Sequence, residues 1–357
     1  MPVEVHQLLP NLDYGDAISN HAMEIRAILR SHGYNSNIYA RYIHPKVAGE
    51  CFPYKEHLKR SSPNNIVVFH HSIGSEVSEY VKTLPDRKIM IYHNITPGHF
   101  FAPYDSHLTH LLIKGREDLK EFVGVPILAL GDSEYNADEL RNVGYPNVEV
   151  LPIITNFKNI DIPPDERTIR KYNGTATNIL FVGRVSPNKK QEDIIKTFCF
   201  YQRYINPDSR LFLVGSCQNP AGYYNSLLNI IKKLDVKNVI FTDHTTQQEL
   251  AAYYKLGNVF LSMSEHEGFG VPLLEAMHFH IPVLAFSSSA VPETMGDAGI
   301  LFKEKRHEEI AELINLVATN SDVRGRIISS QNKRLLDFDA RKIGEKLMSF
   351  IETVKSL

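Results

Sequence analysis

Short apolar runs alternate with longer amphipathic segments along the chain. In the first half, one predicted helix places Ala22, Ile25 and Leu29 on a single face. Alternation of this kind is typical of a parallel sheet with helices on both faces. The first half therefore predicts an α/β domain. The runs that we expect to form its strands are residues 3–9, 65–69, 88–94, 127–133 and 148–154.

The same alternation continues in the second half, which predicts a second α/β domain. Residues 161–175 are rich in proline, glycine and charge, as exposed linkers are. We therefore expect one domain at 1–165 and another at 166–339, followed by an amphipathic helix at 340–357. The strands that we expect in the second domain are residues 178–182, 210–214, 238–242, 258–263, 281–286 and 299–303.

The composition excludes several classes of protein. The chain has 357 residues, 43% of them hydrophobic, which suffices for two domains of ordinary size. A formal net charge of -2 gives no reason to expect nucleic acid as a partner. Cys51, Cys199 and Cys217 are widely spaced and odd in number, which indicates a reducing compartment and no zinc site. No stretch approaches the roughly eighteen apolar residues of a spanning helix, so we expect a cytoplasmic protein.

Residues 264–277 predict a strand end, a glycine turn and a helix start. They read Ser-Glu-His-Glu-Gly-Phe-Gly-Val-Pro-Leu-Leu-Glu-Ala-Met. Gly268 and Gly270 allow the backbone to come close to a ligand, and Pro272 suits the first position of a helix. The three N–H groups after Pro272 are expected to face the turn. Free donors at a helix start attract an anion such as a diphosphate.

Glu267 and Glu275 flank this turn. Eight positions leave two residues of one helix about 80° apart, so the two carboxylates belong to different elements. Both can then point at one ligand and accept hydrogen bonds from sugar hydroxyls. The alternative is a solvated loop residue and a first-turn residue that only complements the helix dipole.

Arg184 and Lys189 lie five positions apart in the loop after the apolar run at 178–182. A guanidinium fork and a point charge at this spacing can bind the same diphosphate. Alternatively, Lys189 and Lys190 form an ordinary basic helix start. Cations oppose the helix dipole at that end, which favours the anion-binding interpretation.

Three segments together resemble the family 4 retaining glycosyltransferases. Residues 267–277 are similar to the family signature, residues 181–189 to its Gly-Arg-x4-Lys diphosphate loop, and residues 290–294 to its Pro-Glu turn. The resemblance implies an α/β protein of GT-B fold, with two Rossmann-like domains facing across a cleft. It also implies that the helix at 340–357 packs back on the N-terminal, acceptor-side domain.

The resemblance implies a role for each motif residue. Glu275 is expected to hold the ribose, Glu267 the sugar hydroxyls, and Arg184 with Lys189 the diphosphate. His93, at the end of a predicted strand, is expected to face the reacting sugar, and with Glu267, Arg184 and Lys189 it forms the expected catalytic set. The other donor-binding positions that the resemblance implies are Gly15, Asp16, Gly183, Gly215, Ser216, His244, Gly268, Phe269, Gly270 and Val271.

The sequence departs from the family pattern at several positions. After the first strand, Asp16 stands where the family usually has a second glycine, so Asp16 either faces the sugar or acceptor or caps the following helix. Asp243 also stands where glycine is common. The alternative for an isolated histidine such as His93 is a purely structural role. The His70–His71 pair is a second candidate for a site histidine at a strand end.

The expected reaction is transfer of a hexosyl group, with retention, from a nucleoside diphosphate sugar of the UDP-glucose or GDP-mannose type. The expected acceptor is a growing surface polysaccharide or a lipid-linked glycan. We expect no cofactor and no metal, since the one Asp-x-Asp, Asp337–Asp339, has the pattern of a helix cap. The alternatives are a GT-B epimerase and a non-catalytic nucleotide-sugar-binding subunit.

We expect at most weak and transient contact with the inner membrane face. Lys55, Lys59 and Arg60, near the apolar Phe52, Tyr54 and Leu58, form the only small basic cluster in the first domain. A solvated loop explains such a cluster as well as a membrane contact does.

Overall fold

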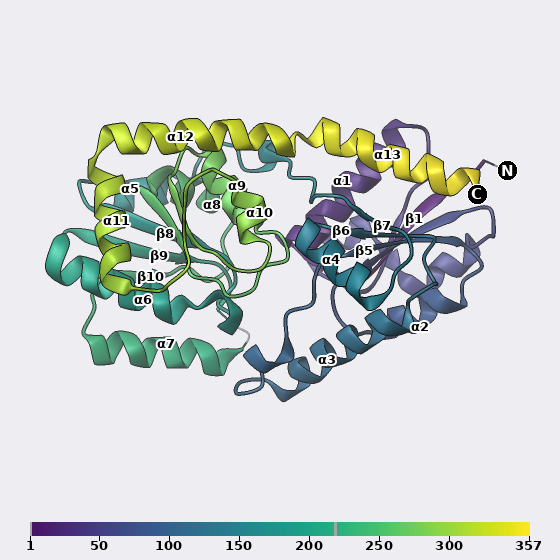
Figure 1. Ribbon diagram of the computed structural model, residues 1–357, viewed down its shortest axis with the longest axis horizontal. Helices are drawn as coiled ribbons and strands as arrows, with labels where there is room; N and C mark the ends of the chain where they lie inside the picture. The colour runs from purple at the N-terminus through teal and green to yellow at the C-terminus, as the bar shows by residue number, and fades with distance from the viewer. Residues whose placement is uncertain (1, 218–219) are drawn as a thin grey trace. The chain divides into compact units, whose positions relative to one another are not determined.

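The chain folds into two compact α/β units. A computed structural model describes residues 2–217 and 220–357 (Figure 1). The first unit comprises residues 1–99, 107–156 and 338–357, and the second comprises residues 100–106 and 157–337. The main crossings between the units therefore fall at Asn156–Phe157 and Asp337–Phe338, the first of them before the boundary expected at 165/166.

The first unit contains a seven-stranded sheet in which every recorded pairing is parallel. Its strand order is β3-β2-β1-β4-β5-β6-β7, which reverses direction between β1 and β4. The five strands expected from the sequence are present, and the structure adds β2 and β3. The strands are β1 Val5–Leu12, β2 Ile38–Ile43, β3 Phe52–Pro53, β4 Ile66–His71, β5 Arg87–Tyr92, β6 Leu128–Gly131 and β7 Val148–Val150.

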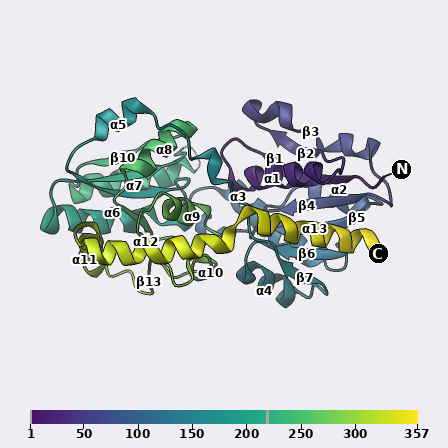
Figure 2. The same cartoon turned by 90° about the horizontal axis from the view of Figure 1, so that it is seen from above.

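Helices from both ends of the chain cover one face of this sheet. Ile25 and Leu29 of α1 and Leu347 of α13 share one buried cluster with apolar side chains of the central strands. Figure 2 shows α1 and α13 on the first unit, and Gly344 of α13 lies against Ile28 of α1. The helices that belong largely to this unit are α1 Ala17–Ser31, α2 Glu76–Thr83, α3 Ser106–Glu121, α4 Glu134–Val143 and α13 Ala340–Ser356, with short helices at Pro45–Glu50, Tyr54–Lys59 and Gly98–Phe100.

The second unit contains a six-stranded parallel sheet, as the sequence predicts. Its order is β10-β9-β8-β11-β12-β13, so the chain moves outward from β8 and then returns to the other side of β8 to form β11. The strands are β8 Thr177–Val182, β9 Ser209–Val214, β10 Val239–Phe241, β11 Val259–Ser262, β12 Val283–Phe286 and β13 Ile300–Phe302.

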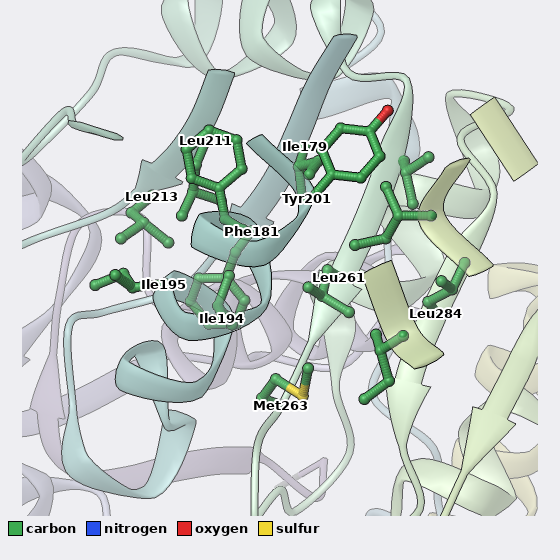
Figure 3. Packing of buried hydrophobic residues seen from close by; sticks show 14 of the residues in the cluster. Ile179, Phe181, Ile194, Ile195, Tyr201, Leu211, Leu213, Leu261, Met263 and Leu284 are labelled. Atoms are coloured by element: carbon green, nitrogen blue, oxygen red, sulfur yellow. The ribbon is translucent and has the colours of Figure 1, made fainter. Parts of the chain in front are cut away.

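Helices cover both faces of the second sheet. Ile179 and Phe181 of β8 pack in a buried cluster with Ile194 of α6 and Ile314 of α11 (Figure 3). Leu180, between them in β8, points to the other face, where it lies close to Gly257 at the end of α8. The helices are α5 Glu166–Tyr172, α6 Gln191–Phe200, α7 Ala221–Leu234, α8 Gln247–Leu256, α9 Val271–His278, α10 Val291–Met295, α11 His307–Thr319 and α12 Ser321–Leu335, with short helices at Phe157–Asn159, Pro187–Lys189, Tyr201–Ile205 and Leu336–Phe338.

The first unit buries several histidines, and this predicts acid sensitivity. Burial lowers the pKa of His57 and His71 to about 4 and that of His21 and His70 well below the usual value. In the unfolded chain these histidines take up protons near pH 6.5, whereas in the folded chain they take up protons only at lower pH. The free energy of unfolding therefore falls as the pH drops below about 6.5, by up to about 1.4 kcal/mol per pH unit for each histidine.

Urea unfolding at a series of pH values from about 7.5 to about 5 measures this slope. His57→Gln should lower the number of protons taken up on unfolding by up to one, and the slope should fall in proportion. His32→Gln, at an exposed position, should leave the slope unchanged. An unfolding free energy that stays constant across this range would show that the buried histidines do not control acid stability.

Candidate functional site

The topology of the second unit brings two of the motifs together. The loop at 183–190 follows β8, and the loop at 263–270 follows β11. Because β8 and β11 are adjacent and the strand order reverses between them, both loops start at the carboxyl edge of the sheet at a topological switch point. Open α/β sheets bind their ligands at this position.

Two glycines allow the loops after β8 and β9 to touch. A Cβ on Gly215 would lie 2.4 Å from the carbonyl oxygen of Gly183. Gly183 and Gly215 have φ angles of +153° and +138°, a backbone conformation that residues with a side chain rarely adopt. The Gly183 N–H donates to the Val214 carbonyl at 2.8 Å. This close approach leaves Arg184 exposed, and within residues 2–217 and 220–357 its guanidinium has no hydrogen-bond or ion-pair partner.

Asn188 joins the loop after β8 to the loop after β11. Its carbonyl oxygen accepts from the Glu265 N–H at 2.8 Å, and its Nδ2 donates to the His266 carbonyl at 3.0 Å. Its Oδ1 also accepts from the Ser186 hydroxyl at 2.6 Å. Asn188 is buried, so these bonds are shielded from water. The sequence analysis did not single out Asn188.

Lys189, the next residue, forms an ion pair with Glu267. Its ammonium group donates to Glu267 Oε2, and the two side chains are only 22% and 14% exposed. Glu265 makes a second set of pairs, with Lys305 at 2.7 Å and Lys190 at 3.3 Å. The structure therefore brings Lys189 and Glu267 together as the sequence analysis expected of one site.

The Pro-Glu turn braces the loop after β11. The Glu267 N–H donates to Ser289 Oγ at 2.7 Å, and Ser288 Oγ donates to the Ser264 carbonyl at 2.6 Å. Thr294 Oγ1 donates to the Phe269 carbonyl at 2.5 Å. The Pro-Glu turn and the two serines before it thus support the loop after β11 through hydrogen bonds to its backbone and from its backbone.

The start of α9 differs from the expectation in one respect. Gly270 has a φ of +98° and precedes the first helical residue, Val271, so Pro272 occupies the second position. The Leu273 N–H was expected to be free, but it donates to the Gly270 carbonyl at 2.9 Å. Pro272 has no N–H, and the Leu273 N–H is already bonded to the Gly270 carbonyl. The helix start therefore offers fewer free donors than predicted.

Glu275 lies in the second turn of α9 and not in the first as expected. Its Oε2 accepts from the hydroxyl of Tyr254, a fully buried residue of α8, at 2.5 Å. Burial raises the pKa of both Glu275 and Tyr254. The Tyr254 ring stacks on Phe279 at 5.0 Å, which fixes the phenol. The sequence analysis did not single out Tyr254 and missed this bond.

The loops after β9 and β10 hold each other in place. Asp243 has a φ of +56°, a conformation that aspartate tolerates better than most residues, which is consistent with its replacing glycine there. Its Oδ1 accepts from the Cys217 N–H at 3.1 Å. Ser216 accepts from the Val185 N–H through its carbonyl at 2.9 Å, whereas His244 is exposed.

In the first unit, Gly15 and Asp16 form the turn before α1. Gly15 is exposed with a φ of +76°. Asp16 Oδ2 accepts from both the N–H and the hydroxyl of Ser19 at 3.1 Å. Asp16 therefore caps α1, which was one of the two alternatives for this residue.

The His93 side chain is turned into the first unit. It is 1% exposed, and its two ring nitrogens lie 2.8 Å from His70 Nδ1 and from Asp132 Oδ2. The two histidines of the His70–His71 pair, the second candidate, contact different groups. His70 contacts His93, and His71 Nε2 lies 2.9 Å from the Gly115 carbonyl oxygen. The role of His93 toward a sugar stays a prediction.

Three carboxylates of the first unit lie close enough to hold a cation, but lysines neutralise them. Glu79 and Glu121 both accept from Lys82, at 3.0 and 2.7 Å, and Asp118 accepts from Lys114 at 2.6 Å. The cluster is therefore an ion-pair network. Asp339, in the Asp-x-Asp segment, caps α13 as the sequence predicts.

The expected basic cluster lies at the β3 edge of the first sheet. Phe52 and Leu58 are exposed, but Tyr54 is buried and its hydroxyl donates to Glu76. Lys59 lies 3.5 Å from Glu56. Over residues 2–217 and 220–357, the helices are all too short or too polar to cross a bilayer.

The chain is similar to several known proteins. Residues 164–334 match the family described as glycosyl transferases group 1. The chain is 24% identical over 224 residues to the O-antigen chain mannosyltransferase B of Escherichia coli, which covers 60% of this chain and 57% of that protein. The chain spans about half the length of the curated relatives it matches.

Solved structures identify the fold. The sucrose-phosphate synthase from Thermosynechococcus elongatus aligns with a TM-score of 0.77 at 15% identity, over 99% of each chain. An Anabaena protein in complex with UDP and glucose aligns with a TM-score of 0.74 at 15% identity, over 98% of this chain and 100% of that one. The expected GT-B fold, with two parallel-sheet α/β domains, is confirmed.

Asn188 offers a test of how the two loops are held together. Asn188→Ala removes two buried side-chain hydrogen bonds, one of them to the His266 carbonyl. We expect the free energy of unfolding to fall by about 1–3 kcal/mol. Thermal unfolding measures this effect.

The control is Asn64→Ala, at an exposed position in the first unit, which should leave the free energy of unfolding unchanged. An Asn188→Ala protein that unfolds as the wild type does would remove Asn188 from this supporting role.

Proposed function

We propose that this chain is a family 4 retaining glycosyltransferase. It transfers a hexosyl group from a nucleoside diphosphate sugar to a growing surface polysaccharide or a lipid-linked glycan. The observation that carries the proposal is the Lys189–Glu267 ion pair at the switch point of the second sheet, with Arg184 exposed in the same loop as Lys189. An exposed guanidinium to which the described residues supply no partner, in the same loop as a lysine–glutamate pair, suits a ligand that brings both phosphates and hydroxyls.

Arg184 and Lys189 would offset the charge that develops on the departing diphosphate. Preorganised cations act in this way in other enzymes and supply a large part of the rate enhancement. Lys189 would move from Glu267 to the diphosphate when the donor binds, which releases the Glu267 carboxylate toward the sugar hydroxyls. Retention would then arise either by same-face attack, with the departing phosphate taking the acceptor proton, or through Glu267 as a nucleophile.

The relatives support two classes of donor. The Anabaena structure holds UDP and glucose, and the Escherichia coli relative is named a mannosyltransferase of an O-antigen chain. UDP-glucose and GDP-mannose are therefore the donors to test first. No cofactor and no metal enter the proposed reaction, which takes the nucleotide sugar as a substrate.

A donor screen tests the proposal. Labelled UDP-glucose and GDP-mannose are incubated with the protein, with and without lipid-linked acceptors, in the presence and absence of EDTA. A glycosylated product that keeps the anomeric configuration supports the proposal. An epimerised donor without an acceptor would identify an epimerase, and binding without turnover would identify a nucleotide-sugar-binding subunit. Activity lost in EDTA and restored by manganese would contradict the metal-free reaction.

Arg184→Ala should lower kcat/KM on the order of 100-fold without changing the free energy of unfolding by more than about 0.5 kcal/mol. The reason is that the side chain is exposed and holds no other part of the fold. Arg326→Ala, a second exposed arginine of the same unit, is the matched control and should retain full turnover. Near-normal turnover of Arg184→Ala would exclude Arg184 from the site.

We also expect the enzyme to work in the cytoplasm with only weak, transient contact with the inner membrane face. Each free cation near an anionic surface contributes about 1 kcal/mol. In the basic cluster, however, Lys59 lies 3.5 Å from Glu56 and Arg60 lies 3.5 Å from Glu4. Two of its three cations therefore already have acidic neighbours.

Sedimentation with anionic vesicles at physiological salt measures this contact. We expect a minor bound fraction that Lys59→Glu reduces only slightly. Tight binding that Lys59→Glu abolishes would show that the cluster is a true membrane anchor.

A further inference from the structure

Four buried side chains form an unbroken hydrogen-bonded chain across the first sheet. Gln7 comes from β1, His70 from β4, and His93 and Asp132 from the segments directly after β5 and β6. Gln7 Oε1 lies 2.9 Å from His70 Nε2, His70 Nδ1 lies 2.8 Å from His93 Nε2, and His93 Nδ1 lies 2.8 Å from Asp132 Oδ2. The chain thus follows the strand order β1-β4-β5-β6.

Gln7 sets the direction of the first hydrogen bond. Its Nε2 donates to the Ala22 carbonyl oxygen at 2.9 Å. Turning the amide round would place two acceptor oxygens against each other, so Oε1 must face His70. Because that oxygen only accepts, His70 Nε2 carries a proton.

The protonation of His70 determines which ring nitrogen of His93 donates to it. Burial lowers the pKa of His70 well below the usual value, so its ring carries a single proton, the one on Nε2. The lone pair on its Nδ1 therefore faces His93, and His93 Nε2 must donate. His21 does not compete for this role, because its Nδ1 accepts the Ile154 N–H at 3.2 Å and burial also lowers its pKa.

A second proton must then lie between His93 and Asp132. If His93 carried only the proton on Nε2, its bare Nδ1 would face a carboxylate oxygen at 2.8 Å, and two acceptors would oppose each other in the interior. The proton resides on Nδ1 or on Oδ2, and burial raises the pKa of Asp132, which favours holding it. In either form the pair carries no net charge, which lowers the cost of burying it.

We propose that Gln7 and His70 are positioning residues for His93. They keep its imidazole protonated on Nε2, and they thereby keep a shared proton in the His93–Asp132 pair. The pair then presents no negative charge at the carboxyl edge of the first sheet.

This inference rests on the proposed function for its consequence. If His93 faces the sugar, as the family resemblance implies, a buried carboxylate with a net charge of -1 next to it would disfavour a nucleoside diphosphate donor, whose charge is also negative. The backbone next to the pair is fixed as well. Asn94, with a φ of +60°, donates from Nδ2 to Asn136 at 2.9 Å, and the Ile95 N–H donates to the Tyr92 hydroxyl at 3.2 Å.

The proton arrangement can be measured in the wild-type protein by NMR of histidine labelled with ¹⁵N and assigned through the backbone. At about pH 7.5 we expect His70 protonated on Nε2 alone and His93 protonated on Nε2, with its second proton in a strong, downfield hydrogen bond to Asp132. A His93 ring that carries one proton, on Nδ1, would overturn the proposal. This readout needs no substrate, so it decides the proposal even if no sugar transfer is found.

Two substitutions test the consequence for the reaction. His70→Leu removes the acceptor for His93 Nε2 and should raise the KM for the nucleotide sugar about tenfold. His70→Asn places a side-chain oxygen near the position of Nδ1 and should restore most of the affinity. His71→Leu, the next residue on the same strand and equally buried, is the matched control. It should cost stability but leave the KM and the His93 signals unchanged.

Either of two results would refute the positioning role. In the first, folded His70→Leu retains the wild-type KM and the wild-type His93 signals. In the second, His71→Leu changes the KM as much as His70→Leu does, which would mean that loss of packing alone accounts for the effect. If the wild type transfers no sugar from any donor, the proposed function fails, whereas the NMR result on His93 still stands by itself.

Discussion

The ion pair between Lys189 and Glu267 is the interaction on which the rest of the second unit's site depends. It joins the loop after β8 to the loop after β11, and those loops start side by side at one sheet edge because β8 and β11 are adjacent and parallel. Asn188 fixes the same junction through the backbone of Glu265 and His266. Burying an ion pair with so little exposure costs desolvation energy. Proteins keep such pairs at sites where the charges bind a ligand.

Much of the fold could be predicted from the sequence. Buried parallel strands are short apolar runs with strong signals, and those of the second sheet lie where the sequence places them. The strand β2 was missed because its second half is exposed, so Arg41 and Tyr42 interrupt the apolar run. The position of β11 beside β8 could not be read either, since strand order depends on contacts between segments far apart in the chain.

The site was only partly predictable, for the same physical reason. Motif spacing indicated that Arg184, Lys189 and Glu267 belong together. It gave no sign that Tyr254 donates to Glu275 or that Gln7 anchors a histidine chain, because such bonds link residues that have no sequence relationship. The structure also gives the Leu273 N–H a role that the motif did not, since it closes its own turn, whereas the cap by Asp16 was one of two alternatives that the sequence offered. Hydrogen-bond partners were therefore not predictable from spacing.

We propose that Lys189 stays paired with Glu267 until a bound diphosphate replaces the Glu267 carboxylate as its partner. Calorimetric titration of UDP into the wild type, Lys189→Ala and Glu267→Gln tests this exchange most directly. We predict that Lys189→Ala weakens UDP binding at least about tenfold, because a charge-assisted bond to the ligand is lost. Glu267→Gln should bind UDP as tightly as the wild type or more tightly, since the lysine no longer leaves an ionic partner. Unchanged affinity in Lys189→Ala, or weaker binding in Glu267→Gln than in Lys189→Ala, would contradict the account.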